Sequence, residues 1–226
     1  MQLSIIIPVL NEEKGLQTFL QALQTYRQSE VEIIVVDGGS SDATVELARP
    51  LCDVIEVAKK GRARQMNAGA NKARGRILLF LHADTLLPDN AISLIEESLR
   101  ENTRVWGRFD VCLSGHRKGL RVIEYCMNSR SRWTGIATGD QAIFVCAKTF
   151  FQLGGYPDIA LMEDISLSKA LKKISFPVCL KEHVITSSRR WESFGICRTI
   201  FLMWKLRLAY YLGVSPEKLA TYYEKK

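Results

Sequence analysis

The stretch VEIIVVDGGSSD, residues 31–42, decides the fold of this chain. Its first six residues are mostly apolar and β-branched, which is typical of a buried strand, and Asp37 with two glycines then ends the strand. The stretch LSIIIPVL, residues 3–10, has the same character and ends at Asn11. A helix is expected between the two strands, because apolar residues recur there at helical spacing: Leu16, Phe19, Leu20 and Leu23.

The same alternation continues through the first half of the chain. Residues 53–57 and 76–81 have the pattern of further strands, and residues 62–73 that of a helix between them, which Gly75 closes. Asp89 caps one more helix. Strands that alternate with helices form a parallel sheet covered by helices on both faces, so we expect an α/β, Rossmann-like fold.

The second half is less regular. Its expected elements are strands at residues 104–113 and 141–146 and helices at residues 119–128, 147–155 and 164–173. The segment SRSRWTGIATGD, residues 129–140, is polar and contains glycines, and we expect a mobile loop there.

Composition and charge narrow the function classes. The chain has 226 residues and a formal net charge of +7, which suits an anionic ligand or an acidic membrane surface. Its Lys and Arg residues are dispersed, so no nucleic-acid partner is expected. Six cysteines without a CxxC pair indicate reduced thiols rather than disulfides or a zinc site. We expect no signal peptide, no membrane span and a cytoplasmic location.

Polar residues follow the apolar strands at the points where the strands end. Because the carboxyl ends of parallel strands meet at one edge of the sheet, where ligands of such folds bind, these residues are candidates for one shared site. They are Asn11, Glu12, Asp37, Gly38, His82 and Asp84.

Asp37 favours a nucleotide ligand, and a basic segment after the third expected strand is compatible with one. A carboxylate at Asp37 accepts N–H bonds from a base or O–H bonds from a ribose, although turn formation is the alternative, which we favour for Asp42. The basic stretch KKGRARQMNAG, residues 59–69, includes Arg62 and Arg64. It is either a diphosphate-binding helix start or a solvated basic face, and its residues alone leave both open.

Acidic residues at two places are candidates for a metal ligand and a catalytic base. Asp84 offers an oxygen to Mg²⁺ or Mn²⁺, and His82, on the same side of an extended segment, offers a nitrogen; alternatively, Asp84 caps a turn. Glu163 and Asp164 are adjacent carboxylates before a helix. Their repulsion raises the pKa of one of them, which suits a general base, and a helix N-cap is the alternative.

Several stretches, taken in order, resemble the motif series of the family 2 glycosyltransferases of GT-A fold, above all small soluble bacterial members. They span about residues 3–190 and are SIIIPVLNEE, IIVVDGGSSDAT, GRARQMNAGANKARGRILLFLHADT, GDQAIFV, LGGY and MEDISLS. The resemblance implies a GT-A domain at residues 1–190 with a C-terminal helical appendage at residues 191–226. It also implies inverting transfer of a sugar from a nucleotide-diphosphate sugar to a hydroxyl acceptor, with help from Mg²⁺ or Mn²⁺.

The resemblance also implies roles for individual residues. Asp164 would be the base that activates the acceptor, with Glu163 beside it. Asp84 takes the place of the last acid of the family's DxD motif and would bind the metal with His82, which replaces the first acid. The nucleotide-sugar site would comprise Pro8, Asn11, Glu12, Asp37, Gly38, Arg62, Arg64, Asn67 and Asp84. The acceptor side would comprise Gly139, Asp140 and Gln141.

Departures from the family pattern keep other functions open. The missing first acid of the DxD motif makes a catalytically inactive nucleotide-sugar-binding or membrane-associated module the alternative. SRRW, residues 188–191, is similar to the QxxRW box of processive members, but Ser187 stands at the Gln position, so polymer synthesis is not inferred. A nucleotidyltransferase or dinucleotide oxidoreductase is disfavoured, because no Gly-rich phosphate loop follows the first strand.

The segment at residues 194–214 is apolar around nearly the whole circumference of an expected helix, with Arg198, Lys205 and Arg207 between the apolar residues. Such a helix needs a partner. We expect packing on the domain first. A homodimer, or a peripheral contact with the inner membrane and a lipid-linked acceptor, are the open alternatives.

Overall fold

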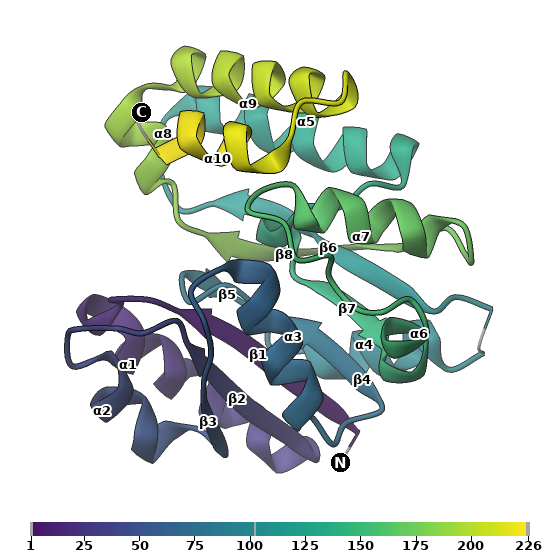
Figure 1. Cartoon of the computed structure of the whole chain (residues 1–226). Coiled ribbons are helices and arrows are strands. Elements are labelled where there is room, and N and C mark those ends of the chain that lie inside the picture. Colours follow the sequence, from purple (N-terminus) through teal and green to yellow (C-terminus); the bar gives the residue numbers. More distant parts are fainter. Residues whose placement is uncertain (1, 102, 225–226) are drawn as a thin grey trace.

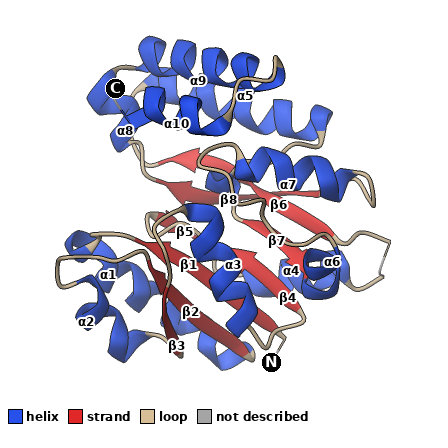
Figure 2. Ribbon diagram, in the orientation of Figure 1, coloured by secondary structure: helices blue, strands red, loops and turns tan. Residues whose placement is uncertain are grey.

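The computed structural model describes residues 2–101 and 103–224, and a sheet of eight strands runs through them (Figures 1 and 2). The strand order across the sheet is β3-β2-β1-β4-β7-β6-β8-β5. The strands are β1 (Leu3–Val9), β2 (Val31–Asp37), β3 (Val54–Val57), β4 (Ile77–Phe80), β5 (Thr85–Leu86), β6 (Trp106–Leu113), β7 (Ile143–Cys146) and β8 (Val178–Thr186). The α/β fold expected from the sequence is confirmed.

The direction of the strands divides the sheet into two halves. β1 pairs in parallel with β2 and β4, and β2 pairs in parallel with β3, so the carboxyl ends of these four strands lie along one edge. β7 runs antiparallel to β4, β6 antiparallel to β7, β8 parallel to β6, and β5 antiparallel to β8. The expected parallel arrangement therefore describes β1–β4, whereas the second half is mixed. The sequence did not predict the mixed half, because an apolar run does not reveal the direction of a strand.

Helices cover both faces of the sheet (Figure 2). α1 (Glu13–Leu23), α2 (Thr44–Ala48) and α4 (Ala91–Leu99) pack on one face, and α3 (Arg62–Lys72), α6 (Ala147–Gln152) and α7 (Glu163–Lys172) on the other. The other described helices are α5 (Lys118–Thr134), α8 (Arg189–Phe194), α9 (Ile196–Tyr211) and α10 (Pro216–Glu224), with 3-10 turns η1 (Gln24–Ser29), η2 (Arg49–Leu51) and η3 (Gly139–Gln141).

β1 is buried from both faces, which explains its almost uninterrupted apolar sequence. Ile5 and Ile7 belong to the core that includes α1 and α4, whereas Ile6 belongs to the core that includes Met66 of α3. Gly69 permits the close approach of α3, since a Cβ there would lie 2.5 Å from Cγ2 of Ile6. The first turn of α3, which carries the basic stretch, is thereby held at the edge of the sheet where β1–β4 end.

A buried carboxylate links β1, β2 and the segment after α3. Glu32 of β2 accepts hydrogen bonds from Ser4 Oγ at 2.6 Å, from the Arg74 amide at 2.6 Å and from Arg74 Nε at 3.0 Å. Burial acts to raise the pKa of Glu32, but these bonds and the charge of Arg74 outweigh it and lower the pKa below its ordinary value. The polar residue inside the apolar strand is therefore fully partnered.

The prediction of a loop at residues 129–140 is wrong for residues 129–134, which are helical. α5 continues through Thr134 and ends at Gly135, whose φ of 65° suits a glycine at a helix end. Polarity alone misled the prediction, because Arg and Ser are tolerated in helices and Ser131 is fully buried in spite of its hydroxyl.

β8 was not expected from the sequence. Three consecutive polar residues, Lys181, Glu182 and His183, interrupt its apolar residues and conceal the strand. Its pairing with β6, in register from Asp110 opposite His183 to Leu113 opposite Thr186, carries the chain back to the edge where β4 ends.

The C-terminal helices lie together with α5 at one end of the molecule (Figure 1). Leu206 of α9 packs with Ile165 of α7 and Leu219 of α10, and Ile196 and Ile200 of α9 pack against α5. None of the described helices has the length and apolar character needed to cross a bilayer. The boundary at residue 190 between domain and appendage stays a prediction, and Met1 and residues 225–226, at the outer ends of the two parts, lie outside the described residues.

Candidate functional site

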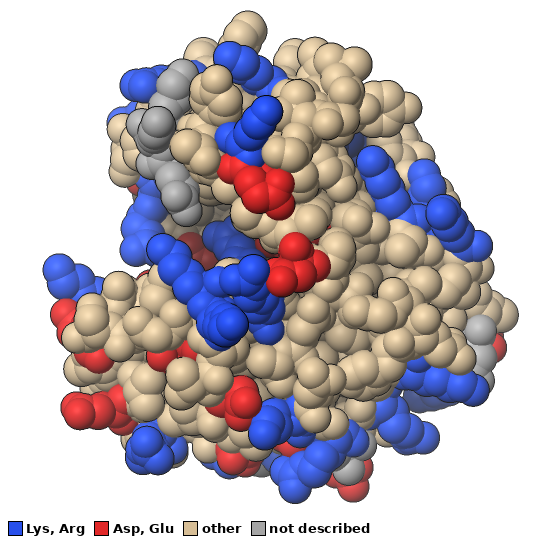
Figure 3. All heavy atoms as spheres, in the orientation of Figure 1, with Lys and Arg blue, Asp and Glu red and all other residues tan. Residues whose placement is uncertain are grey.

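A cavity of about 580 Å³ lies between the ends of β1 and β4 on one side and α8–α10 on the other. Pro8 and Glu12 line it from the end of β1, and His82 and Asp84 from the end of β4. Because β7 runs antiparallel to β4, the turn η3 before β7 reaches the same edge and adds Gly139 and Asp140. Figure 3 shows Lys and Arg side chains around and inside the hollow in this face.

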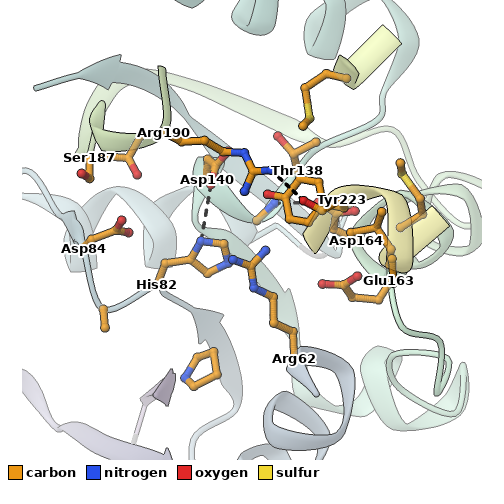
Figure 4. Close-up of a pocket in the computed structure, with 18 of the residues that line it drawn as sticks. Arg62, His82, Asp84, Thr138, Asp140, Glu163, Asp164, Ser187, Arg190 and Tyr223 are labelled. Carbon is orange, nitrogen blue, oxygen red and sulfur yellow. Dashed lines mark hydrogen bonds and ion pairs between the residues drawn. The ribbon is translucent and has the colours of Figure 1, made fainter. Parts of the chain in front are cut away.

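The two adjacent carboxylates begin α7 and face the cavity (Figure 4). Asp164 Oδ2 accepts a hydrogen bond from the Gly139 amide at 3.0 Å, which orients the carboxylate relative to η3. Glu163 is 6% exposed, and burial first and the charge of Asp164 second raise its pKa to about 7. Near neutral pH Glu163 therefore gains and loses a proton readily, as acid–base chemistry requires.

His82 and Asp140 form a second polar pair. His82 Nδ1 lies 3.4 Å from Asp140 Oδ1 (Figure 4). Burial acts to raise the pKa of Asp140, but the hydrogen bond with His82 and the charges of His82, Arg62 and Arg207 outweigh it and lower the pKa. A Cβ at Gly139 would lie 2.5 Å from His82 Nε2, so the imidazole is packed tightly against η3.

Asp84 lies on the side of His82 away from Glu163 and Asp164, and it points into the cavity (Figure 4). Arg189 Nη2 lies 3.7 Å from Asp84 Oδ2, and the carboxylate is 38% exposed, so it is free to take a further partner. Within residues 2–101 and 103–224, no three His, Cys, Asp or Glu side chains converge closely enough to hold a metal by themselves.

Some residues expected at the site support it from outside the cavity. Asp37 accepts hydrogen bonds from the amides of Gly39 and Ser40 at 2.9–3.2 Å, so its oxygens serve the turn after β2. Asn11, with a left-handed φ of 53°, bonds the same turn through the Ser41 amide at 2.8 Å. Gly38 packs against Gln65, which itself lines the cavity.

Three further expected residues have partners elsewhere. Arg64 Nε donates to Asp158 Oδ1 at 2.7 Å on the surface. Asn67 bonds both the amide and the carbonyl of Tyr156, and Gln141 is buried in a capping box with Thr138. The residues predicted for the site that do line the cavity are Pro8, Glu12, Arg62, His82, Asp84, Gly139, Asp140, Glu163 and Asp164.

Cationic residues of the C-terminal helices line the cavity and were not predicted. Arg207 of α9 faces Asp164 and Asp140, although burial lowers its pKa. Arg190 of α8 stacks on the ring of Tyr223 at 3.6 Å and donates from Nη2 to its carbonyl at 3.3 Å, which holds α10 beside the cavity. Each arginine had one signal in the sequence that could have indicated a site. Arg190 belongs to the SRRW stretch, and Arg207 is a charged residue within an otherwise apolar helix.

Comparison with known proteins gives one family. The sequence model described as "Glycosyl transferase family 2" matches residues 4–154. Glycosyltransferase AglE of Haloferax volcanii is 40% identical over 90 residues, which are 36% of this chain and 30% of that protein. The probable glycosyltransferase YdaM of Bacillus subtilis is 24% identical over 219 residues, 86% of this chain and 52% of that protein. The chain thus spans about a third to a half of these curated relatives.

Solved structures with the same fold carry nucleotide sugars. Mannosyltransferase PcManGT from Pyrobaculum calidifontis, in complex with GDP-Man and Mn²⁺, has a TM-score of 0.65 and 19% identity over 93% of this chain and 61% of that chain. S. aureus TarS 1-349 in complex with UDP-GlcNAc has a TM-score of 0.65 and 18% identity over 83% of this chain and 58% of that chain. At this level of identity the likeness shows the fold, which agrees with the fold expected from the sequence.

Proposed function

The chain belongs to glycosyl transferase family 2, and from this premise we propose that it transfers a sugar from a nucleotide-diphosphate sugar to a hydroxyl acceptor. The observation that carries the proposal is the shared cavity, in which Asp84, Asp164 and the cations Arg62 and Arg207 face the same space. The named relatives are glycosyltransferases, and UDP-GlcNAc and GDP-Man occupy two structures of the same fold. These support the donor class and leave the base and the sugar unassigned.

The donor set of the cavity fits a divalent cation bound together with the donor. Mg²⁺ is commonly held by one or two carboxylates plus the phosphates of a substrate, and Asp84 offers one partly exposed carboxylate at the cavity wall. His82 Nδ1 faces Asp140 and Nε2 lies against Gly139, so His82 would have to reorient to become a ligand and Asp84 would be the principal protein ligand. The cation would neutralise charge on the leaving diphosphate.

Asp164 is the proposed base of an inverting transfer. It would take the acceptor proton while the acceptor oxygen attacks the anomeric carbon from the face opposite the diphosphate, which leaves with the electron pair of the broken C–O bond. A Glu163 that is partly protonated near pH 7 carries less negative charge beside Asp164. The amide of Gly139 orients that charge.

Cations on the cavity wall would bind the diphosphate. Arg62 lies at the start of α3, where helix amides also favour anions, and Arg189 approaches Asp84 from α8. Burial acts to lower the pKa of Arg62, but Tyr223 and the carboxylates of Glu163, Asp140 and Asp164 outweigh it, so the pKa is raised. The guanidinium therefore stays charged among the acids.

The test combines donor binding with turnover. A panel of nucleotide-diphosphate sugars is screened by thermal shift with and without Mn²⁺, because a ligand that binds the native state raises the melting temperature. Release of nucleoside diphosphate is then measured with candidate acceptors. Asp164→Asn should keep the thermal shift and lose more than about 100-fold in release rate, the scale of general-base catalysis. Asp89→Asn, a change of the same kind at an exposed position before α4, should keep both, because the N-cap of α4 is Asn90 and not, as expected from the sequence, Asp89.

Two outcomes would count against the proposal. Donor-induced stabilisation without release for any acceptor would favour the inactive binding module. Equal release by Asp164→Asn and the wild type would remove Asp164 from the role of base. The proposal also includes a cytoplasmic location. A lipid-linked molecule is one candidate for the acceptor.

A further inference from the structure

The outward face of α9 is a stripe of exposed apolar side chains. Positions spaced by three or four residues point away from the molecule and expose most of their surface: Phe201 (75%), Trp204 (70%), Leu208 (61%), Tyr211 (79%) and Leu212 (74%). The opposite side of the helix holds its two buried residues, Thr199 and Leu206. Packing on the domain therefore uses one side of α9 and leaves the other apolar side largely exposed, where Lys169 Nζ lies 5.6 Å from the ring centroid of Tyr211.

α5 continues this surface. α5 and α9 pack together through Leu120 and Ile123 against the partly buried Ile196 and Ile200, and both helices lie at the same end of the molecule (Figure 1). The side of α5 away from its buried residues exposes Val122, Tyr125 and Trp133. We call these three residues and the five outward residues of α9 the α5–α9 face.

The α5–α9 face is larger than the apolar patches that soluble monomers usually expose. It includes five aromatic residues that are each at least 70% exposed. At roughly 150–250 Å² per aromatic side chain they present more than about 500 Å² without the aliphatic residues. The largest apolar patch of a typical monomer is about 300–600 Å² in total and is often functional.

The charges on α9 itself have one sign. Residues 195–214 contain Arg198, Lys205 and Arg207 and no Asp or Glu. Arg207 faces the cavity, while Arg198 and Lys205 are exposed. The one acid of α5, Glu124, is engaged by the Leu113 amide and by Arg121. Lys205 Nζ lies 5.8 Å from the ring centroid of Tyr222, and no acid of α5 or α9 pairs with Arg198 or Lys205. Aromatic residues beside such cations are the composition of surfaces that sit at a lipid–water interface, where headgroups supply the negative charge.

We propose that the α5–α9 face docks on an anionic lipid surface. A second copy of the chain fits this face less well, because a two-fold contact places the same patch on both sides and would bring Arg198 and Lys205 near their own copies. Anionic headgroups instead offer opposite charges to both residues, and the interfacial region of the bilayer accommodates the aromatic side chains.

Docking in this way would place the candidate site close to the lipid. The inward side of α9 contributes Met203, Leu206 and Arg207 to the cavity wall, so one helix separates the cavity from the α5–α9 face. A helix with its side chains is about 10 Å across. For the transfer proposed above, on which this consequence rests, the acceptor hydroxyl would then be offered at headgroup level.

Co-flotation of the full chain with vesicles tests the docking. The wild type should float with phosphatidylcholine–phosphatidylglycerol vesicles and much less with phosphatidylcholine alone. The triple variant Phe201→Gln, Trp204→Gln, Leu208→Gln should bind at least about 100-fold more weakly, because it withdraws three large apolar groups from the lipid. The double variant Arg198→Gln, Lys205→Gln should lose about 25-fold on the anionic vesicles only, about fivefold per cation.

A matched control carries the same kind of change away from the face. Val57 of β3 and Phe151 of α6 are also exposed apolar residues, and Val57→Gln, Phe151→Gln should float like the wild type. Each variant is checked by its urea-unfolding midpoint, which reports an intact fold without any ligand.

A second measurement avoids substitutions on the apolar stripe. Cys197 and Cys126 are the exposed cysteines among those described, and Cys197 lies on α9. An environment-sensitive fluorophore on Cys197 in a Cys126→Ser background should shift to the blue with anionic vesicles. The same fluorophore on Val57→Cys, in a background that lacks both exposed cysteines, should not shift.

Three results would overturn the docking: no flotation of the wild type with anionic vesicles, equal flotation of the triple variant, or a stable lipid-free dimer that the triple variant converts to monomer. The donor response separates the two proposals. Donor stabilisation without flotation would leave the transferase proposal standing and remove the docking. Flotation without any donor response would leave the docking standing and count against the transferase proposal.

Discussion

The raised pKa of Glu163 predicts a specific pH dependence of stability, which Glu163→Gln should abolish. The pKa rises from its ordinary value of 4.5 to about 7 in the folded chain, because the carboxyl is buried and adjoins Asp164. In the window between these values the folded state binds a proton that the unfolded state has released. The free energy of unfolding of the wild type therefore falls as pH rises through this window.

The structure gives the size of the effect. A pKa difference of about 2.5 pH units, at about 1.4 kcal/mol per unit, corresponds to about 3 kcal/mol. Glutamine has nearly the same shape and no titratable proton, so the variant lacks this pH-dependent contribution to the free energy of unfolding. Its stability relative to the wild type should be constant below pH 4.5, rise by about 3 kcal/mol between pH 4.5 and 7, and be constant again above that.

Urea unfolding of both proteins at a series of pH values from 4 to 9, about half a unit apart, measures the difference. Glu97→Gln, at an exposed position of α4, is the matched control and should give a flat difference. The shape of the Glu163→Gln curve is decisive, since any offset that is independent of pH reflects other lost contacts. A flat curve for Glu163→Gln would show that the pKa of Glu163 is not raised in the folded chain.

The remaining predictions concern three other residues. If Asp84 binds a divalent cation with the donor, chelation should abolish nucleoside diphosphate release, and Asp84→Asn should raise the Mn²⁺ concentration needed for half-maximal release at least about tenfold. Glu32→Gln should lower the free energy of unfolding at pH 7 by about 1–3 kcal/mol. Because the folded pKa of Glu32 is lowered, that difference should shrink as pH falls below the ordinary value of 4.5, in urea unfolding at several pH values. Gly139→Ala should displace His82, whose Nε2 would lie 2.5 Å from the new Cβ, and reduce release with little change in melting temperature. Unchanged release in Gly139→Ala would show that the position of His82 is unimportant.

The parallel half of the sheet and much of the cavity could be predicted from local sequence patterns. Runs of apolar residues, helical spacing and turn residues act within short windows, so β1, β2 and β4 and the polar residues at their ends could be predicted. The order of the motifs identified the family, and Asp84, Glu163 and Asp164 indeed line one cavity. Their catalytic and metal-binding roles stay predictions.

Which side chains reach the cavity depends on how segments far apart in the chain pack together. Asp37 and Asn67 follow the expected motifs, yet the turn after β2 and the backbone of Tyr156 occupy their polar atoms. Arg190 and Arg207 reach the cavity from helices far along the chain, because α8 and α9 fold back over the sheet edge. The physical reason is that hydrogen bonds and ion pairs between distant segments depend on how helices pack, whereas a local pattern records only which face of its own helix or strand is apolar. The exposed half of α9 shows the same limit, since its sequence indicates an apolar helix, and packing alone selects the side that remains uncovered.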